Sequence, residues 1–263
     1  MKACINGRQI AYSDEGQGPA IVLIHGFPLS RAMWAPQIEA LTSAGYRVVA
    51  PDLAGFGESE CGDEPYSMDR LADDVAQLML QLGIGRAVVG GMSMGGYVLL
   101  NLLERHPKRI AGAAFLVTRC TADDDTGREK RNSMAEAVRQ GRRHEVIDAF
   151  IQLVFAPNTL EQNPALVDQV RGIMEQSSDE GLIGALQAMR DRPDYSSRLN
   201  DFPVPALVVG AGEDRAVPPE TIPAFTKGLP AGRSCIIDGA GHMANLEQPE
   251  AFNQCLLDFL ELF

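Results

Sequence analysis

The chain has 263 residues, of which 45% are hydrophobic and 22% charged, and its formal net charge at pH 7 is −12. These proportions are ordinary for a globular protein and exclude a chain dominated by disorder. So negative a charge argues against nucleic acid and against an anionic membrane surface as partners, because both require a basic face on the protein. The length suits a single α/β unit that carries an insertion.

The cysteines indicate neither a disulfide framework nor a zinc site, because their number is odd and no two are spaced C-x-x-C. They are Cys4, Cys61, Cys120, Cys235 and Cys255. The first residues lack an apolar core of signal-peptide length, and no stretch has the length and apolarity needed to span a bilayer. We therefore expect a reduced, cytoplasmic protein.

The first part of the chain alternates strand patterns with helix patterns. Apolar and polar residues alternate over residues 2–12, on both sides of Asn6-Gly7, a dipeptide that favours tight hairpins. This pattern predicts two antiparallel strands. Ser67 is placed to cap a helix that runs to about Leu82, because apolar residues recur at helical spacing behind it. Further patterns predict strands at 20–24, 46–50, 87–89 and 110–118 and helices at 32–44 and after residue 93.

The alternation of strand and helix patterns stops between residues 121 and 197. There the composition becomes charged, and the apolar residues follow helical spacing without a convincing strand. Strand patterns then resume at 205–210 and 234–237, before a closing helix that ends at Phe263. We therefore assign residues 1–120 and 198–263 to a core and residues 121–197 to a helical cap inserted after the sixth core strand.

Strands that alternate with helices predict right-handed βαβ units, and hence an α/β fold with a mostly parallel sheet and helices on both faces. In such a sheet the ligand site lies beyond the carboxyl ends of the strands. Those ends are predicted to carry His25, Ser93, Asp214 and His242. The candidate catalytic residues are therefore expected along one edge of the sheet.

The segment Gly91-Met92-Ser93-Met94-Gly95 fits the pattern G-x-S-x-G between a predicted strand and a predicted helix. In this pattern a serine in a strained turn exposes its hydroxyl group, and small neighbours are needed because the strand and the helix pass very close. The alternative is a serine that only caps the helix. The setting and the additional glycines favour a nucleophile.

A serine nucleophile needs a base within hydrogen-bond reach and a third group that orients the base. Of the four histidines, His242 follows a predicted strand among small residues, so its ring is expected at the same edge as Ser93. His25 is expected to brace its loop through backbone hydrogen bonds, His106 to act as a favourable charge at a helix C-terminus, and His144 to be solvated.

Asp214 is the best orienting acid, because it ends an apolar strand in a glycine-containing turn at that edge. Glu213 beside it and Asp123 near the start of the insertion are competitors. Asp214 also has the alternative role of capping a helix that begins near Pro218. The order serine, aspartate, histidine along the chain is the order in which nucleophile, acid and base follow one another in this architecture.

Together these motifs resemble those of the α/β-hydrolase fold superfamily along nearly the whole chain. They are His25-Gly26-Phe27-Pro28, residues 51–59, residues 91–96, Gly212-Glu213-Asp214 and Gly241-His242. The residue at the centre of the G-x-S-x-G turn is Ser93, and not the aspartate or cysteine found there in other branches. The chain therefore resembles the serine carboxylesterases and enol-lactonases. In the insertion the resemblance is one of position only.

The resemblance implies that Ser93 is the nucleophile, His242 the base and Asp214 the acid of a catalytic triad. It also implies that the backbone N–H groups of Phe27 and Met94 form the oxyanion hole.

His25, Gly26 and Trp34 are expected beside the substrate. Trp34 and the two methionines that flank Ser93 have the alternative role of filling the core. No metal ion and no organic cofactor are expected.

We therefore predict a serine hydrolase that cleaves a small carboxylic ester or lactone, as a monomer or homodimer. A carbon–carbon bond hydrolase is the first alternative, with Arg128, Arg131 or Arg139 binding a substrate carboxylate. A second alternative is a cofactor-free perhydrolase, a group once called non-haem haloperoxidases, against which the long insertion argues. The third alternative is a ligand-binding member of the fold without turnover.

Overall fold

The computed structural model describes residues 1–62 and 65–263, which form one eight-stranded sheet in the order β1-β2-β4-β3-β5-β6-β7-β8. The pairs β1–β2 and β2–β4 are antiparallel, and every other neighbouring pair is parallel. The strands are β1 (Lys2–Ile5), β2 (Arg8–Glu15), β3 (Ala20–Ile24), β4 (Arg47–Pro51), β5 (Ala87–Met92), β6 (Ile110–Leu116), β7 (Ala206–Ala211) and β8 (Gly232–Ile237). The predicted α/β class with a mostly parallel sheet is confirmed.

Right-handed crossovers determine which helix covers which face of the sheet. The chain crosses from β3 through α1 (Ala35–Ser43) to β4, and then in the opposite direction through α2 (Met68–Gln81) to β5, so α1 and α2 cover opposite faces. α3 (Met94–Arg105) packs beside α2, and α11 (Pro249–Leu260) packs beside α1. Because both faces are covered, every residue of β5 and β7 is buried.

The predicted hairpin and the predicted cap of α2 are both confirmed. Asn6 and Gly7 have φ values of 47° and 81°, which suit the two-residue turn that matches the twist of antiparallel strands. Ser67 accepts a hydrogen bond from the backbone N of Arg70 at 3.2 Å, and α2 ends at Gln81. Short-range patterns therefore located both elements to within three residues.

The strand predicted at 110–118 is two residues too long, because β6 ends at Leu116. Val117 has a φ of 41°, in the left-handed region that β-branched residues rarely adopt, so the chain turns there. The turn brings Oγ1 of Thr118 to 2.7 Å from the backbone O of Ser93. The apolar pattern continues through the turn, and therefore the sequence did not show where the strand ends.

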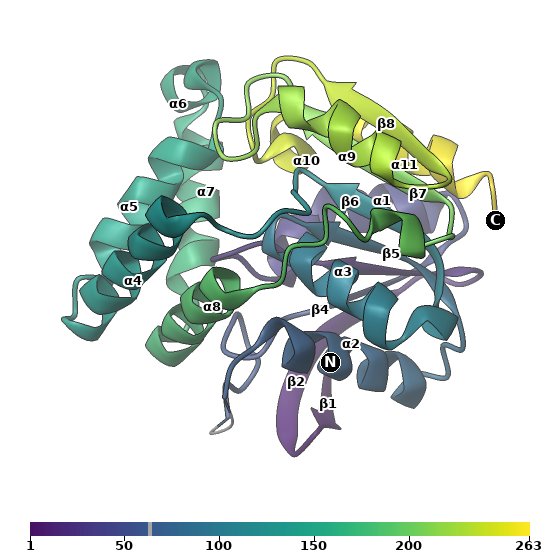
Figure 1. Cartoon of the computed structure of the whole chain (residues 1–263), viewed down its shortest axis with the longest axis horizontal. Helices are drawn as coiled ribbons and strands as arrows, with labels where there is room; N and C mark the ends of the chain where they lie inside the picture. The colour runs from purple at the N-terminus through teal and green to yellow at the C-terminus, as the bar shows by residue number, and fades with distance from the viewer. Residues whose placement is uncertain (63–64) are drawn as a thin grey trace.

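Five α-helices separate β6 from β7 and lie together at one side of the sheet, on the left of Figure 1. They are α4 (Asp125–Arg139), α5 (Arg143–Val154), α6 (Pro157–Gln162), α7 (Pro164–Glu175) and α8 (Asp179–Asp191). The helical cap predicted after the sixth strand is confirmed. Across the described ranges, each helix is too short or too polar to cross a membrane.

One contact between the cap and the core requires two glycines. Ser178, at the start of α8, donates from its backbone N and its hydroxyl group to the O of Gly55 at 2.9 and 3.0 Å. A Cβ atom on Gly181, in the first turn of α8, would lie 2.3 Å from that same oxygen. The N-terminus of α8 therefore reaches the loop after β4 only because residue 181 has no side chain.

The expectation that the cysteines form no disulfide needs one correction. A disulfide joins Cys235 in β8 to Cys255 in α11, whose Cα atoms are 6.5 Å apart. The two cysteines are 20 residues apart in the sequence and become neighbours only when the last helix packs back on the edge strand. Spacing alone gave no sign of this pair.

Replacing Gly181 by alanine is expected to lower the free energy of unfolding by about 1–3 kcal/mol, because the new methyl group must displace the backbone of Gly55. Gly172→Ala in α7 is the matched control, because a Cβ atom there meets nothing within 4 Å. Alanine is the better helix former, so the control is expected to gain about 0.5–1 kcal/mol. Urea denaturation measures both values, and a stabilised Gly181→Ala variant would contradict the close contact.

Candidate active site

Ser93 lies between β5 and α3 in a strained turn. Its φ of 52° and ψ of −113° fall outside the regions open to most residues with a side chain. Its backbone N donates to the O of Leu116 at 3.0 Å, and its backbone O accepts from Oγ1 of Thr118 at 2.7 Å. Strain of this kind persists only where the surroundings impose it, and it is concentrated at functional sites.

Glycines on both sides of the serine allow the strand and the helix to pass this close. A Cβ atom on Gly91 would lie 2.2 Å from the O of Gly95, and one on Gly95 would lie 2.3 Å from the O of Ile24. Both distances are shorter than real Cβ contacts. The packing therefore requires the glycines that made this segment recognisable in the sequence.

The interpretation of Ser93 as an ordinary helix cap is wrong. Its side chain makes no capping hydrogen bond to α3. By contrast, Ser67 and Ser178 do cap α2 and α8 through their hydroxyl groups. The hydroxyl group of Ser93 is therefore not committed to the helix.

His242 and Asp214 are joined by a hydrogen bond at the same edge of the sheet. Nδ1 of His242 lies 2.7 Å from Oδ2 of Asp214. The other carboxylate oxygen accepts from the backbone N atoms of Ala216 and Val217 at 2.7 and 2.9 Å. Asp214 thus anchors its own loop with one oxygen and fixes the imidazole ring with the other, which leaves Nε2 of His242 unengaged by the acid.

The competing histidines and acids lie elsewhere. Nε2 of His106 is 2.7 Å from Oδ1 of Asp73, where α3 ends. His144 is exposed, as the sequence predicted, and Glu213 is exposed as well. Asp123 is buried and binds arginine side chains. Within the described structure, none of these groups competes for the position that Asp214 and His242 occupy.

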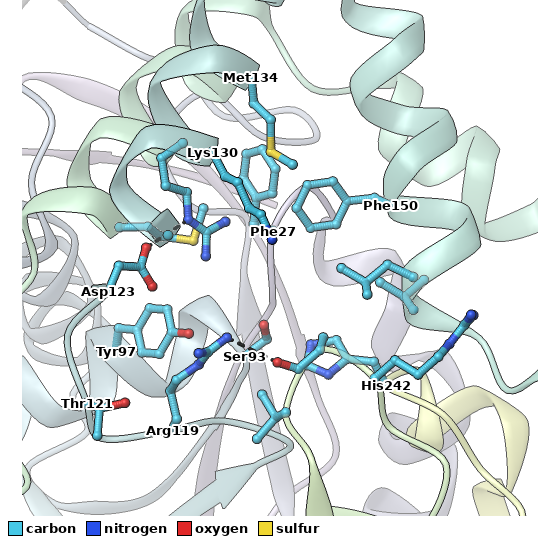
Figure 2. A pocket seen from close by; sticks show the side chains of 18 of the residues that line it. Phe27, Ser93, Tyr97, Arg119, Thr121, Asp123, Lys130, Met134, Phe150 and His242 are labelled. Atoms are coloured by element: carbon cyan, nitrogen blue, oxygen red, sulfur yellow. Dashed lines mark hydrogen bonds and ion pairs between the residues drawn. The ribbon is translucent and has the colours of Figure 1, made fainter. Parts of the chain in front are cut away.

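Ser93 and His242 line one cavity of about 560 Å³, whose other walls come from both the core and the cap. Figure 2 shows the two sides of this cavity, with Phe27, Phe150 and Met134 gathered on one side of Ser93. The rings of Phe27 and Phe150 meet edge to face with their centroids 5.0 Å apart. The other side is more polar and is formed by Tyr97, Arg119, Thr121 and Asp123.

His25 is fully buried and braces the loop after β3. Its Nδ1 lies 2.8 Å from the O of Gly26, and its Nε2 accepts from the N of Leu53 at 2.9 Å. Burial lowers the pKa of His25, although the Asp52 carboxylate opposes that shift. A neutral ring, with Nδ1–H donating to Gly26, fits both contacts. The predicted bracing is present, whereas His25 is not part of the cavity wall.

The loop that His25 braces lies directly against the serine. The O of Gly26 also accepts from the N of Leu29 at 3.0 Å, and a Cβ atom on Gly26 would lie 3.2 Å from the Cβ of Ser93. In a planar trans peptide the N–H of Phe27 points away from that carbonyl. Met94 begins α3, so its N–H has no carbonyl one turn earlier in the helix to bind.

Several residues that the sequence suggested for substrate contact lie away from the cavity wall. Trp34 is fully buried and belongs to the core, which was the alternative role considered for it. Of the three cap arginines proposed to bind a carboxylate, Arg128 and Arg139 do not line the cavity. Arg131 does line it, but its Nε is 3.1 Å from Oδ2 of Asp123.

Asp123 is a buried acidic group of the cavity wall, and two arginines neutralise it. Nη2 of Arg192 lies 2.7 Å from Oδ1, and Nε of Arg131 lies 3.1 Å from Oδ2. Burial alone would raise the pKa of Asp123, but the hydrogen bonds and charges of the two arginines hold that pKa below its usual value. Arg192 also lies over the ring of Tyr97, 4.2 Å from its centroid.

Arg119 and Phe150 are among the residues of the cavity wall that sequence reasoning missed. Arg119 follows the end of β6 by three residues, and this position at the carboxyl edge was the available signal. Phe150 comes from α5, and no local pattern tells which side of a cap helix faces the sheet.

Glu247 connects the cap to the loop that carries His242. Its Oε1 accepts from the N of Gly241 at 2.9 Å, and its Oε2 accepts from the N of Ala156 and from Oγ1 of Thr159 at 2.9 and 2.7 Å. Burial raises the pKa of Glu247, although these hydrogen bonds favour the carboxylate. One side chain thus joins the α5–α6 connection to the residue before the histidine.

Residues 19–249 match the family described as alpha/beta hydrolase fold, which covers most of the core and the whole cap. The chain therefore belongs to the α/β-hydrolase fold family, as the motifs predicted.

Similar solved structures include a thermophilic esterase from Thermogutta terrifontis with malate bound, at 33% identity and a TM-score of 0.95 over 99% of this chain and 97% of that chain. The enol-lactonase from Burkholderia xenovorans matches at 29% identity and a TM-score of 0.91, over 99% of this chain and all of that chain. A bromoperoxidase from Bacillus anthracis matches at 28% identity and a TM-score of 0.89, over 99% of both chains. These relatives support hydrolase activity for this chain.

The match to the bromoperoxidase corrects one argument from the sequence. From the sequence alone, the length of the insertion argues against membership of the former haloperoxidases. A protein of that name, however, has the same fold over nearly the full length of both chains. The cap therefore does not exclude the perhydrolase alternative.

Replacing Glu247 by glutamine is expected to lower the free energy of unfolding by about 1–2 kcal/mol at pH 7, because an amide cannot accept hydrogen bonds at both ends. Glu129→Gln, at an exposed position of α4, is the control. It is expected to change the free energy of unfolding by less than about 0.5 kcal/mol. Chemical denaturation of the three proteins measures both differences.

The pH dependence of the same comparison tests the electrostatics of Glu247. The folded state raises the pKa of this group above its ordinary value of 4.5, so the folded protein binds the proton more tightly than the unfolded chain. The resulting stability is fully present below pH 4.5 and is lost as the pH rises through the folded pKa. The advantage of wild type over Glu247→Gln is therefore expected to shrink as the pH rises, and growth of that advantage would contradict the assigned direction.

Proposed function

We propose that the protein is a serine hydrolase that cleaves a small carboxylic ester or lactone through an acyl-enzyme intermediate. One observation carries the proposal, namely the 2.7 Å hydrogen bond between Nδ1 of His242 and Oδ2 of Asp214 beside the cavity that Ser93 lines. The bond favours the tautomer with the proton on Nδ1, so Nε2 is free to accept a proton. A general base requires that arrangement.

In the proposed reaction, Oγ of Ser93 forms a bond to the carbonyl carbon of the substrate, and its proton moves to Nε2 of His242. Asp214 stabilises the imidazolium ion that results. When the tetrahedral intermediate collapses, the bond from carbon to the leaving oxygen breaks, and His242 returns the proton to that oxygen. Water then repeats the sequence on the acyl-enzyme, which releases the acid and restores Ser93.

We assign the oxyanion hole to the backbone N–H groups of Phe27 and Met94. Met94 begins α3 and follows the serine, and the loop of Phe27 lies against Ser93. In comparable sites the loss of one such donor costs about 2.7–4 kcal/mol. His25 acts here as a positioning residue, because its bond to the O of Gly26 fixes the peptide whose N–H belongs to Phe27.

The cavity supports a small substrate with an apolar part. Its volume of about 560 Å³ lies in the range of small-molecule sites. Phe27, Phe150 and Met134 offer an apolar wall beside the serine. Esterase and enol-lactonase relatives support the same class of substrate.

Perhydrolysis is a second candidate, and the similarity to the bromoperoxidase favours it. In that reaction hydrogen peroxide, in place of water, attacks the acyl-enzyme and yields a peracid. Carbon–carbon bond hydrolysis has less support, because two of the cap arginines suggested for it lie away from the cavity wall and the third binds Asp123.

The test is hydrolysis of nitrophenyl esters from acetate to decanoate, followed from the pre-steady state, with and without added hydrogen peroxide. Ser93→Ala is expected to abolish the initial burst and to lower kcat by at least about a thousandfold, because no acyl-enzyme can form. Ser133→Ala, an exposed serine on α4, is the matched control and keeps both burst and rate.

A fluorophosphonate probe followed by peptide mass analysis locates the acylated residue independently of any substrate preference. Labelling of Ser93 in the wild type is the expected result. A folded wild type that shows neither turnover nor labelling would overturn the proposal and leave the ligand-binding alternative. A second product that appears only with peroxide would show that the acyl-enzyme also supports perhydrolysis.

A further inference from the structure

We infer that Arg119 binds a carboxylate of the substrate, so that the ester or lactone carries a free acid group besides the bond that is cleaved. The inference rests on the proposed function, because it names the substrate class of that same cavity.

The side chain of Arg119 has hydrogen-bonding capacity that the protein does not use. Its Nη2 donates to the backbone O of Ala216 at 3.1 Å. Its Nε is buried and has no hydrogen-bond partner in the described structure. Buried donors are nearly always satisfied, so the unpaired Nε shows that the protein does not use the full hydrogen-bonding capacity of this guanidinium group, which lines the cavity.

The other cations of the cavity wall are engaged or exposed. Arg131 binds Asp123, and Arg215 donates to backbone oxygens, among them the O of Phe155 at 3.1 Å. Lys130 is exposed on α4. Arg119 combines a buried, unpaired donor with a fixed position.

The charge of the cavity also favours an anion. Four lysine and arginine side chains line it against two carboxylates, in a chain whose net charge is −12. Of the two carboxylates, Asp123 is neutralised by arginines, and Asp124 accepts from the N of Gly127 to cap α4. A locally positive cavity in an acidic protein attracts anionic substrates in preference to neutral ones.

The position of Arg119 suits a carboxylate at some distance from the reacting carbonyl. The preceding residue, Thr118, binds the backbone O of Ser93, and Ala216 lies two residues after Asp214. The guanidinium group is thus held between the two segments that position the candidate nucleophile and acid. Figure 2 shows Arg119 with Tyr97 on the side of the cavity away from Phe27 and Phe150.

The chemistry of the free donor points to a carboxylate. The planar guanidinium group carries a positive charge and N–H donors that match the oxygens of a carboxylate. A substrate that places its acid group there directs the rest of the molecule toward Ser93. A neutral ester of the same size offers a carbonyl oxygen there but no negative charge, so its contact with the guanidinium group is weaker.

The experiment compares the monomethyl esters of succinate, glutarate and adipate with the corresponding dimethyl esters by methanol release. The measured quantity is the ratio of kcat/KM between the anionic and the neutral ester of one chain length. In the wild type this ratio is expected to exceed one for at least one length. Arg119→Met is expected to lower it by about tenfold to a hundredfold, mainly through KM, and Arg119→Lys to restore part of it.

Arg215→Met is the matched control, because it removes the same charge from the same cavity at a guanidinium group already bound to backbone oxygens. Its ratio is expected to stay within about twofold of the wild-type ratio, since the donors of Arg215 are already bound to backbone oxygens and offer the substrate no free N–H group. A merely structural role for Arg119 would lower both rates alike and leave the ratio unchanged, which overturns the inference. An equal fall of the ratio in both variants also overturns the inference, because the preference would then come from the total positive charge of the cavity and not from a contact with Arg119.

A binding measurement separates this inference from the proposed function. Calorimetric titration of Ser93→Ala with glutarate reports the acid site without any turnover, and the added Arg119→Met substitution is expected to remove the binding. Equal binding in both proteins overturns the assignment of Arg119 and leaves the proposed hydrolase intact. Loss of ester turnover and of Ser93 labelling in the wild type, with glutarate binding preserved, overturns the hydrolase but retains the acid site.

Discussion

The arrangement at the sheet edge depends on how closely β5, α3 and the ends of β3 and β6 approach one another at Ser93. The serine stays at a φ of 52° because Leu116 and Thr118 bind its backbone and because glycines leave room for the crossing. Its surroundings on this side are mostly main-chain atoms, which have no rotamers to lose. A site built in this way keeps its geometry before a substrate arrives.

The parts of the fold that sequence patterns predicted correctly are those that local chemistry determines. Asn6-Gly7 specifies its hairpin because few other residues adopt two left-handed conformations in succession. The glycines around Ser93 were visible because a Cβ atom at Gly91 would strike the chain only four residues away. The alternation of strands and helices fixed the parallel sheet, and handedness then followed.

The parts that the sequence did not reveal depend on contacts between distant segments. Cys235 meets Cys255 only because α11 returns to β8, and Nε of Arg119 is buried without a partner through packing that no local pattern describes. His25 and Trp34 lie in suggestive positions along the chain, yet the first bonds to backbone and the second fills the core. Whether a polar or aromatic residue near a strand end reaches the cavity is decided by packing, which periodicity does not describe.

Two attachments join the cap to the core. The O of Gly55 accepts hydrogen bonds from the start of α8, and the Glu247 carboxylate joins the N of Gly241 to the N of Ala156 in the α5–α6 connection. Neither attachment involves α4, whose side chains Arg131 and Met134 line the cavity. Selection can therefore exchange residues on α4 without disturbing the joints that hold the cap. The cavity residues of α4 can therefore vary, while the attachments at Gly55 and at Glu247 remain under constraint.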